Sequence, residues 1–66
     1  RLGDLDGAIQ DFDKAIEISP KDGNAYFNRG ISMEMSGDMN DACVDWRKAL
    51  ELGHTPAAKF LGKNCQ

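Results

Sequence analysis

The residues most able to do chemistry are few and far apart in the chain. His54 is the one histidine, and Cys43 and Cys65 are the two cysteines. They lack the close Cys and His spacing of a zinc site, and His54 falls where the chain needs a turn, so we expect its side chain to be solvated or capping. A catalytic site needs a nucleophile, a base and a group that orients them. We therefore predict no catalytic, cofactor-binding or metal-binding residues, and we predict that the chain is not an enzyme.

Acidic side chains are plentiful, and two of them held together could act as general acid and base. Most of them fall off the apolar stripes of the segments that carry them, as do Asp11, Asp13, Asp41 and Asp45. We therefore expect these carboxylates on solvated helix surfaces and not in an acid and base pair.

The two cysteines allow a single disulfide, but they lack the dense, regular spacing of a secreted disulfide framework. Cys43 and Cys65 each occupy a position where a helix would carry an apolar residue. Because free cysteine is often buried, we expect two reduced thiols in the interior, with one disulfide as the alternative.

Length and charge narrow the classes of partner. The 66 residues form at most one small domain with a thin core, and the net charge is −3 with acids and bases interleaved. No basic stripe is present, so we predict neither a nucleic-acid partner nor a membrane partner. The chain starts at Arg1, so we expect an excised piece, and with no targeting signal the cytoplasm is only a default expectation.

The sequence repeats itself at an offset of 34 residues. The segment GDLDGAIQDFDKAIEI (3–18) aligns with GDMNDACVDWRKALEL (37–52), and the mismatches at apolar positions are conservative, as at Phe12 and Trp46. An internal repeat of this length is typical of solenoid architectures. The identical pairs are Gly3 and Gly37, Asp4 and Asp38, Ala8 and Ala42, Asp11 and Asp45, Lys14 and Lys48, Ala15 and Ala49, and Glu17 and Glu51.

Each copy has helical periodicity, because its apolar residues recur at steps of three and four. We expect each Gly-Asp pair to end one helix and start the next, and Thr55 to cap a last helix with Pro56 in its first turn. Breakers at 19–23 and 53–56 leave four helices joined by loops that suit antiparallel neighbours. The predicted fold is all-α, made of antiparallel helix-turn-helix repeats.

These residues resemble the tetratricopeptide repeats, a family of 34-residue helix-turn-helix units. The aromatic at Tyr26, the pair Arg29-Gly30 and the large residue Met33 match the first helix of a unit, although Arg29 replaces the usual Leu. The resemblance implies a single domain over 1–66, with a partial repeat at 1–20, a complete repeat at 21–54 and a terminal helix at 55–66. It implies repeat packing by Ala8, Phe12, Ala15, Tyr26, Gly30, Met33, Ala42, Trp46 and Ala49.

The segment NAYFNRGISMEM (24–35) carries two apolar stripes. Tyr26, Gly30 and Met33 form the stripe that the resembling family packs inside the unit. Phe27, Ile31 and Met35 form a second stripe, rotated by about 100° from the first. In that family the second stripe faces a concave groove where peptides lie, so we predict a scaffold that binds a protein or peptide partner. The alternative, that neighbouring helices cover this stripe, stays open. The predicted peptide-binding residues are Asn24, Phe27, Asn28, Ile31, Glu34, Met35, Lys59 and Lys63.

A narrower form of this prediction concerns Asn28, Lys59 and Lys63. In members of the family that clamp acidic C-terminal tails of chaperones, an Asn and a basic pair four residues apart hold the terminal carboxylate. Here the basic pair is shifted by about one residue, and the unit that would supply the remaining groups is missing. We keep this carboxylate clamp as a minority hypothesis.

A different function follows from what the first copy lacks. The helix from Asp4 to Ile18 has no partner within its own unit, and solenoids need about three repeats to bury a continuous core. We therefore expect exposed apolar surface at this end. The alternative function is self-assembly, in which two copies form a homodimer or larger homo-oligomer by docking or swapping helices.

Overall fold

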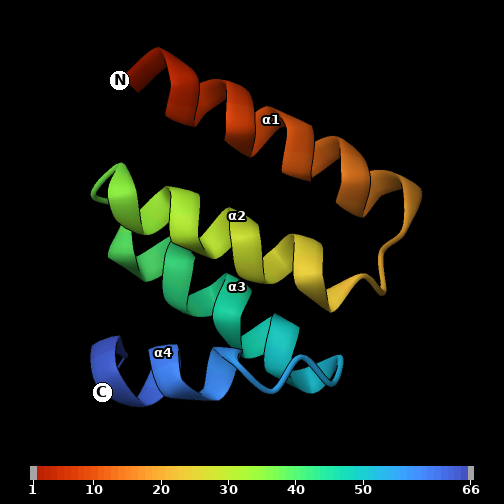
Figure 1. Cartoon of the computed structure of the whole chain (residues 1–66), viewed down its shortest axis with the longest axis vertical. Coiled ribbons are helices and arrows are strands. Elements are labelled where there is room, and N and C mark those ends of the chain that lie inside the picture. Colours follow the sequence, from red (N-terminus) through yellow and green to blue (C-terminus); the bar gives the residue numbers. More distant parts are fainter. Residues whose placement is uncertain (1, 66) are drawn as a thin grey trace.

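The computed structural model describes the backbone of residues 2–65 and the side chains of residues 5–65. Its helices are α1 (Leu2–Ile18), α2 (Gly23–Met35), α3 (Met39–Glu51) and α4 (Ala57–Asn64), and the described residues contain no strand. The helices lie side by side in chain order and form a flat molecule of 28 × 26 × 14 Å (Figure 1). The prediction of an all-α repeat fold is confirmed.

The turn between α2 and α3 follows the predicted Gly-Asp chemistry. Gly37 has a φ of +94°, a left-handed conformation that side chains disfavour, and it ends α2. Asp38 then caps α3 by accepting a hydrogen bond from the amide of Asp41 at 3.3 Å. At the start of α2, Asp22 caps in the same way, accepting from the amide of Ala25 at 3.3 Å. These caps set where α2 and α3 begin and so help fix their register.

Two predicted helix starts were wrong. α1 begins at Leu2, so Gly3 and Asp4 lie inside its first turn and do not precede it; the side chains of these two residues lie outside the described set. At α4, Pro56 and not Thr55 holds the N-cap position, and no side chain caps the helix. The reason is that backbone carbonyls already accept the free amides: Ala57 donates to His54 and Ala58 donates to Thr55.

The core lies between α2, α3 and α4. Trp46 is fully buried together with Ala42, Ala49 and Ala57, and its indole nitrogen donates a hydrogen bond to the carbonyl of Phe27 at 3.3 Å. Gly30 allows this approach, because a Cβ built on it would lie 2.6 Å from the indole nitrogen. Small residues thus let α2 and α3 come close enough to enclose one large ring.

Cys43 and Cys65 form a disulfide with their Cα atoms 5.8 Å apart, so the expectation of two reduced thiols was wrong. The bridge joins α3 to the C-terminal end of α4. Both residues are partly buried beside the core, as expected for their apolar positions. The helix packing that places two thiols against the same core also brings them within bonding reach of each other.

Candidate functional site

A hollow of about 350 Å³ lies between the C-terminal half of α2 and α4. Glu34 forms the α2 wall, and α4 supplies the rest of the lining: Lys59, Phe60, Lys63 and Asn64. The ring of Phe60 is held in place by the core, because its centre lies 5.1 Å from that of the Trp46 ring. The hollow therefore has an aromatic surface fixed by the core and polar groups at its rim.

The charges around the hollow are unequal. Lys59 and Lys63 lie one turn apart on α4, are exposed, and form no ion pair with any described residue. Glu34 is a single negative charge on the opposite wall. The rim thus offers more unpaired positive than negative charge, which favours an acidic ligand group.

Three of the predicted binding residues lie on α2 but do not line the hollow. Asn24 and Asn28 are linked by a side-chain hydrogen bond of 3.3 Å, with Asn24 exposed and Asn28 half-buried. At the other end the side chain of Met35 is 66% exposed. α2 therefore presents amides at one end and a thioether at the other.

Phe27 and Ile31 lie against the core. Both are half-buried, and the ring of Phe27 packs 4.6 Å from the His54 ring and 5.0 Å from the Phe60 ring. His54 is itself half-buried in this contact and makes no side-chain cap, contrary to the expected solvated or capping role. Among the sequence-predicted peptide-binding residues, Glu34, Lys59 and Lys63 are brought together around the hollow, while Phe27 and Ile31 share their surface with packing.

The residues predicted to pack the repeat divide into two groups. Gly30, Ala42, Trp46 and Ala49 are buried, with Tyr26 and Met33 half-buried against them. The α1 residues are only half-buried, namely Ala8, Phe12 and Ala15. Positions that match across the repeat thus differ in burial, because α3 packs against α2 and α4 whereas α1 packs against α2 (Figure 1).

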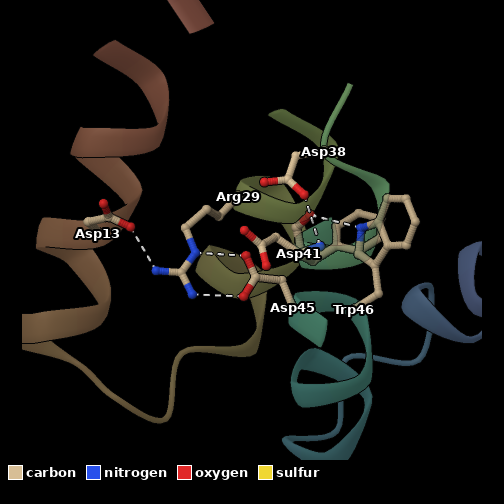
Figure 2. A network of polar contacts seen from close by, with 7 residues as sticks. Asp13, Arg29, Asp38, Asp41, Asp45 and Trp46 are labelled. Atoms are coloured by element: carbon tan, nitrogen blue, oxygen red, sulfur yellow. Dashed lines mark hydrogen bonds and ion pairs between the residues drawn. The ribbon is translucent and has the colours of Figure 1, made fainter. Parts of the chain in front are cut away.

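A charged network that sequence reasoning missed ties three helices together (Figure 2). Arg29 of α2 donates two hydrogen bonds of 2.7 Å to the two oxygens of Asp45 on α3, and a third of 2.7 Å to Asp13 on α1. Asp45 is only 3% exposed, so the expectation that it lies on a solvated surface was wrong. The buried carboxylate is tolerated because the guanidinium satisfies both of its oxygens.

This network also explains why Arg29 replaces the Leu that is usual in the resembling family. Its guanidinium lies over the face of the Tyr26 ring, with the guanidinium carbon 5.4 Å from the ring centre. The hydrogen bonds to Asp45, together with Asp13, raise the pKa of Arg29 above its ordinary value although burial opposes this. A signal was present in the sequence: Asp45 lies three residues after Ala42 and four before Ala49, which places it on the buried stripe.

Asp38 and Asp41 lie close together at the exposed start of α3 (Figure 2). The pKa of Asp41 is raised, first by its hydrogen bond with Asp38 and then by the negative charge of that neighbour. The crowding follows from the capping geometry described for Asp38. It accompanies the start of the helix and does not involve the hollow.

The part of the chain that the structure describes contains no group of three or more His, Cys, Asp or Glu side chains arranged for a metal ion. Within residues 2–65, no helix has both the length and the apolar character that crossing a membrane requires.

Comparison with known proteins gives matches over most of the chain. The sequence model of a family described as TPR repeat matches residues 1–37. The tetratricopeptide repeat protein 36 homolog of Nematostella vectensis is 39% identical over 56 residues, which cover 85% of this chain and 31% of that protein. Human tetratricopeptide repeat protein 36 is 38% identical over 50 residues, covering 76% of this chain and 26% of that protein.

A further relative is the Protein STIP1 homolog of Dictyostelium discoideum, which is 39% identical over 49 residues, or 74% of this chain and 9% of that protein. The chain thus spans less than a third of the length of the curated relatives that it matches. No solved structure matches it significantly.

Proposed function

The chain belongs to the TPR repeat family, whose members generally mediate protein–protein interactions, and from this premise we propose that it is a scaffold that binds an acidic, partly apolar segment of a partner protein along α2 and α4. The hollow between these helices carries the proposal. There the ring of Phe60 and the unpaired charges of Lys59 and Lys63 line the same concave surface.

The chemistry of the hollow indicates the kind of segment it accepts. An apolar side chain of the partner would lie on Phe60, where burial against a fixed aromatic ring supplies affinity. Carboxylates next to that side chain would pair with Lys59 and Lys63, which have no competing partner within the described chain. Apolar contact thus supplies strength and the two lysines supply selectivity.

The rest of the segment would follow α2. Asn24 and Asn28 can each donate to and accept from the backbone of an extended peptide, and Met35 offers a flexible apolar contact. Phe27 and Ile31 contribute the edges of side chains that are otherwise part of the core. A terminal carboxylate held by Asn28 with the two lysines remains the narrower form of the proposal.

The proposal is tested with a fluorescein-labelled peptide of sequence EELLE, with either a free or an amidated C-terminus, titrated by fluorescence anisotropy. The double variant K59E/K63E should weaken binding about 100-fold or more, because two attractive pairs become repulsive. The matched control is K14E/K21E, which makes the same charge change at exposed lysines of α1 and of the α1–α2 loop. The control should bind within about twofold of the wild type.

Equal loss in both double variants would show a general charge effect and would overturn the proposed site. Failure of the wild type to bind the peptide at 1 mM, a concentration about 1000-fold above a micromolar affinity, would overturn the proposed ligand class. Amidation of the C-terminus separates the two forms of the proposal. Only the carboxylate clamp predicts that amidation weakens binding.

Self-assembly is the second candidate function, and one observation favours it. Within residues 5–18, the apolar side chains of α1 are at best half-buried, and Ile18 at the end of the helix is 74% exposed. A second copy could cover this surface through a symmetric contact. Sedimentation equilibrium from about 1 μM to 1 mM would show a concentration-dependent mass; a monomer at every concentration in this range, which spans typical transient affinities, would reject self-assembly.

A further inference from the structure

α4 has little intrinsic support. It is eight residues long, its N-cap is Pro56, and no side chain caps its first turn. Isolated helices shorter than about 12 residues are marginal in water, so α4 must be held by contacts with the rest of the chain. Its place matters because α4 provides most of the lining of the hollow.

The ring contacts of α4 lie in its first half. Ala57 is fully buried, and the Phe60 ring packs on Trp46 and Phe27. In the second half Leu61 packs against the core, and the last turn, which carries Lys63 and Asn64, ends at Cys65, which is bonded to Cys43 of α3. The disulfide therefore fixes the end of α4 that the ring contacts do not reach.

The repeat allows the two cysteine positions to be compared with the equivalent positions of α1 and α2. The residues 34 positions before Cys43 and Cys65 are Ile9 and Ile31, both half-buried on α1 and α2. Asp13 and Arg29, which form an ion pair, correspond by the same offset to Arg47 and Lys63, which have like charge. At the α3–α4 contact the bridge thus stands where α1 and α2 carry isoleucines, and no ion pair between the described residues of α3 and α4 supports it.

We propose that the Cys43–Cys65 bridge is a redox latch that holds α4 against α3 and keeps the hollow formed. A dithiol reductant opens it by thiol–disulfide exchange: one thiolate attacks a sulfur of the bridge, and the other sulfur leaves as a thiolate and takes up a proton. The second thiol of the reductant then resolves the mixed disulfide. Two electrons and two protons pass to the cysteines, and the dithiol becomes a disulfide.

Opening the bridge leaves two partly buried thiols in place of a covalent link. The second half of α4 is then retained only by what its own side chains contribute, and Lys63 carries a charge of the same sign as Arg47 of the neighbouring helix. The end of α4 separates from α3 and takes Lys63 and Asn64 with it. Partner binding therefore depends on the redox state, a consequence that rests on the proposed function of the hollow.

Trp46 provides a direct readout that needs no ligand. It is the single tryptophan of the chain, is fully buried, and packs on Phe60 of α4. On adding dithiothreitol to the 66-residue chain, its emission should shift to longer wavelength and its quenching by acrylamide should rise. Amide exchange in residues 57–64 should become faster by about 100-fold, while exchange in α2 changes much less.

The double variant C43I/C65I is the matched control, because it places at α3 and α4 the residues found at the equivalent positions of α1 and α2. It should show none of these responses to dithiothreitol. The wild type compared with itself, oxidised and reduced, tests the latch even if this variant does not fold. Unchanged Trp46 emission and unchanged exchange in α4 after complete reduction, verified by mass, would overturn the latch.

The EELLE peptide separates this inference from the proposed function. Binding that is at least tenfold weaker for the reduced chain supports both. Equal binding in the two states refutes redox control of the hollow. Binding in neither state, with α4 still released on reduction, refutes the proposed ligand class and leaves the latch supported.

Discussion

The α1–α2 contact and the α3–α4 contact occupy equivalent places in the 34-residue repeat, and we call them the first step and the second step. Different chemistry holds each of them. In the first, Asp13 of α1 pairs with Arg29 of α2 at 2.7 Å. In the second, Arg47 and Lys63 occupy the equivalent positions and cannot pair. A disulfide is found there, at positions that hold two isoleucines in the first contact.

The difference shows what the repeat preserves. Small and aromatic residues recur because they set how closely the helices approach, and Ala42 and Trp46 are buried as a result. The groups that fasten one helix to the next are free to change, because any apolar, ionic or covalent pair of suitable size can serve at that place. The comparison can be tested by removing or exchanging these groups.

The largest expected effect is at the aromatic position of each step. Trp46→Ala should lower the free energy of unfolding by about 4 kcal/mol, because it empties the centre of the core. Phe12→Ala, at the equivalent place in α1, should cost about 2 kcal/mol because this ring is only half-buried. Urea titrations followed by circular dichroism at 222 nm, in a stabilising osmolyte, measure both.

Equal losses for the two variants would show that α1 is as fully packed as α3. That result would contradict the difference in burial on which the comparison depends. The osmolyte is needed because a chain of this size has only about 5 kcal/mol of total stability.

Next is Arg29, which pairs with Asp13 in the first step and also with the buried Asp45 of α3. Arg29→Met should destabilise the fold by about 3 kcal/mol, because the carboxylate of Asp45 remains buried without its partner. Asp13→Asn removes only the outer, 53% exposed partner and should cost less than about 1 kcal/mol. Thermal and urea unfolding of the two variants measure the two losses of unfolding free energy. A loss for Asp13→Asn as large as that for Arg29→Met would contradict the conclusion that Arg29 and Asp45 form the more important pair.

Removal of the disulfide should have a similar or slightly smaller effect. The bridge closes a loop with a sequence separation of 22, so C43A/C65A should lower stability by roughly 3 kcal/mol in the chain-entropy description. The measurement is urea unfolding of the variant beside the oxidised wild type. A loss below about 0.5 kcal/mol would mean that the bridge adds nothing to the α3–α4 contact.

The two steps can also be exchanged. The variant I9C/I31C/C43I/C65I moves the cysteines to the first contact without changing composition. Equivalent positions of the repeat predict equivalent geometry, so we expect a disulfide to form between positions 9 and 31, detected by mass after alkylation. Two alkylated thiols after oxidation would show that the steps differ in geometry as well as chemistry.

The smallest expected effect on stability comes from introducing at the α3–α4 contact the ion pair that is found at the α1–α2 contact. Arg47→Asp places a carboxylate where it can meet Lys63, as Asp13 meets Arg29. The melting temperature should rise by about 2 °C, since exposed pairs contribute little. Arg47→Asn is the control for simple removal of like charge, and a gain as large in the control would show that no pair forms.

The repeat made most of the architecture predictable. An offset match over 16 residues gives the helices, their order and the left-handed turn at Gly37, because these depend on local periodicity and cap chemistry. The resemblance to the tetratricopeptide repeats pointed to Trp46 and Gly30 as packing residues. At Gly3 and Asp4 the same motif failed, since α1 continues through it to Leu2. A motif that can end a helix does not have to do so.

The contacts that join the helices were not predictable by considering one helix at a time. The buried pair of Arg29 and Asp45 and the bridge of Cys43 and Cys65 each join residues from two helices, and composition alone favours exposed acids and free thiols. The repeat carries a signal for the bridge, because Cys43 and Cys65 occupy the places of Ile9 and Ile31, two apolar positions on neighbouring helices. The site residues around the hollow depend in the same way on how α2 and α4 meet.

The bridge also determines how the chain bears mechanical load. A pull applied to the backbone at Cys65 passes through the sulfur atoms to Cys43 and so enters the middle of α3 directly. The segment between the two cysteines, which contains all of α4, lies outside the path of the force and is not stretched. Tension is carried instead by α1, α2 and the first turns of α3, so in a stretched array this chain would yield at its N-terminal side while the α4 wall of the hollow stays folded.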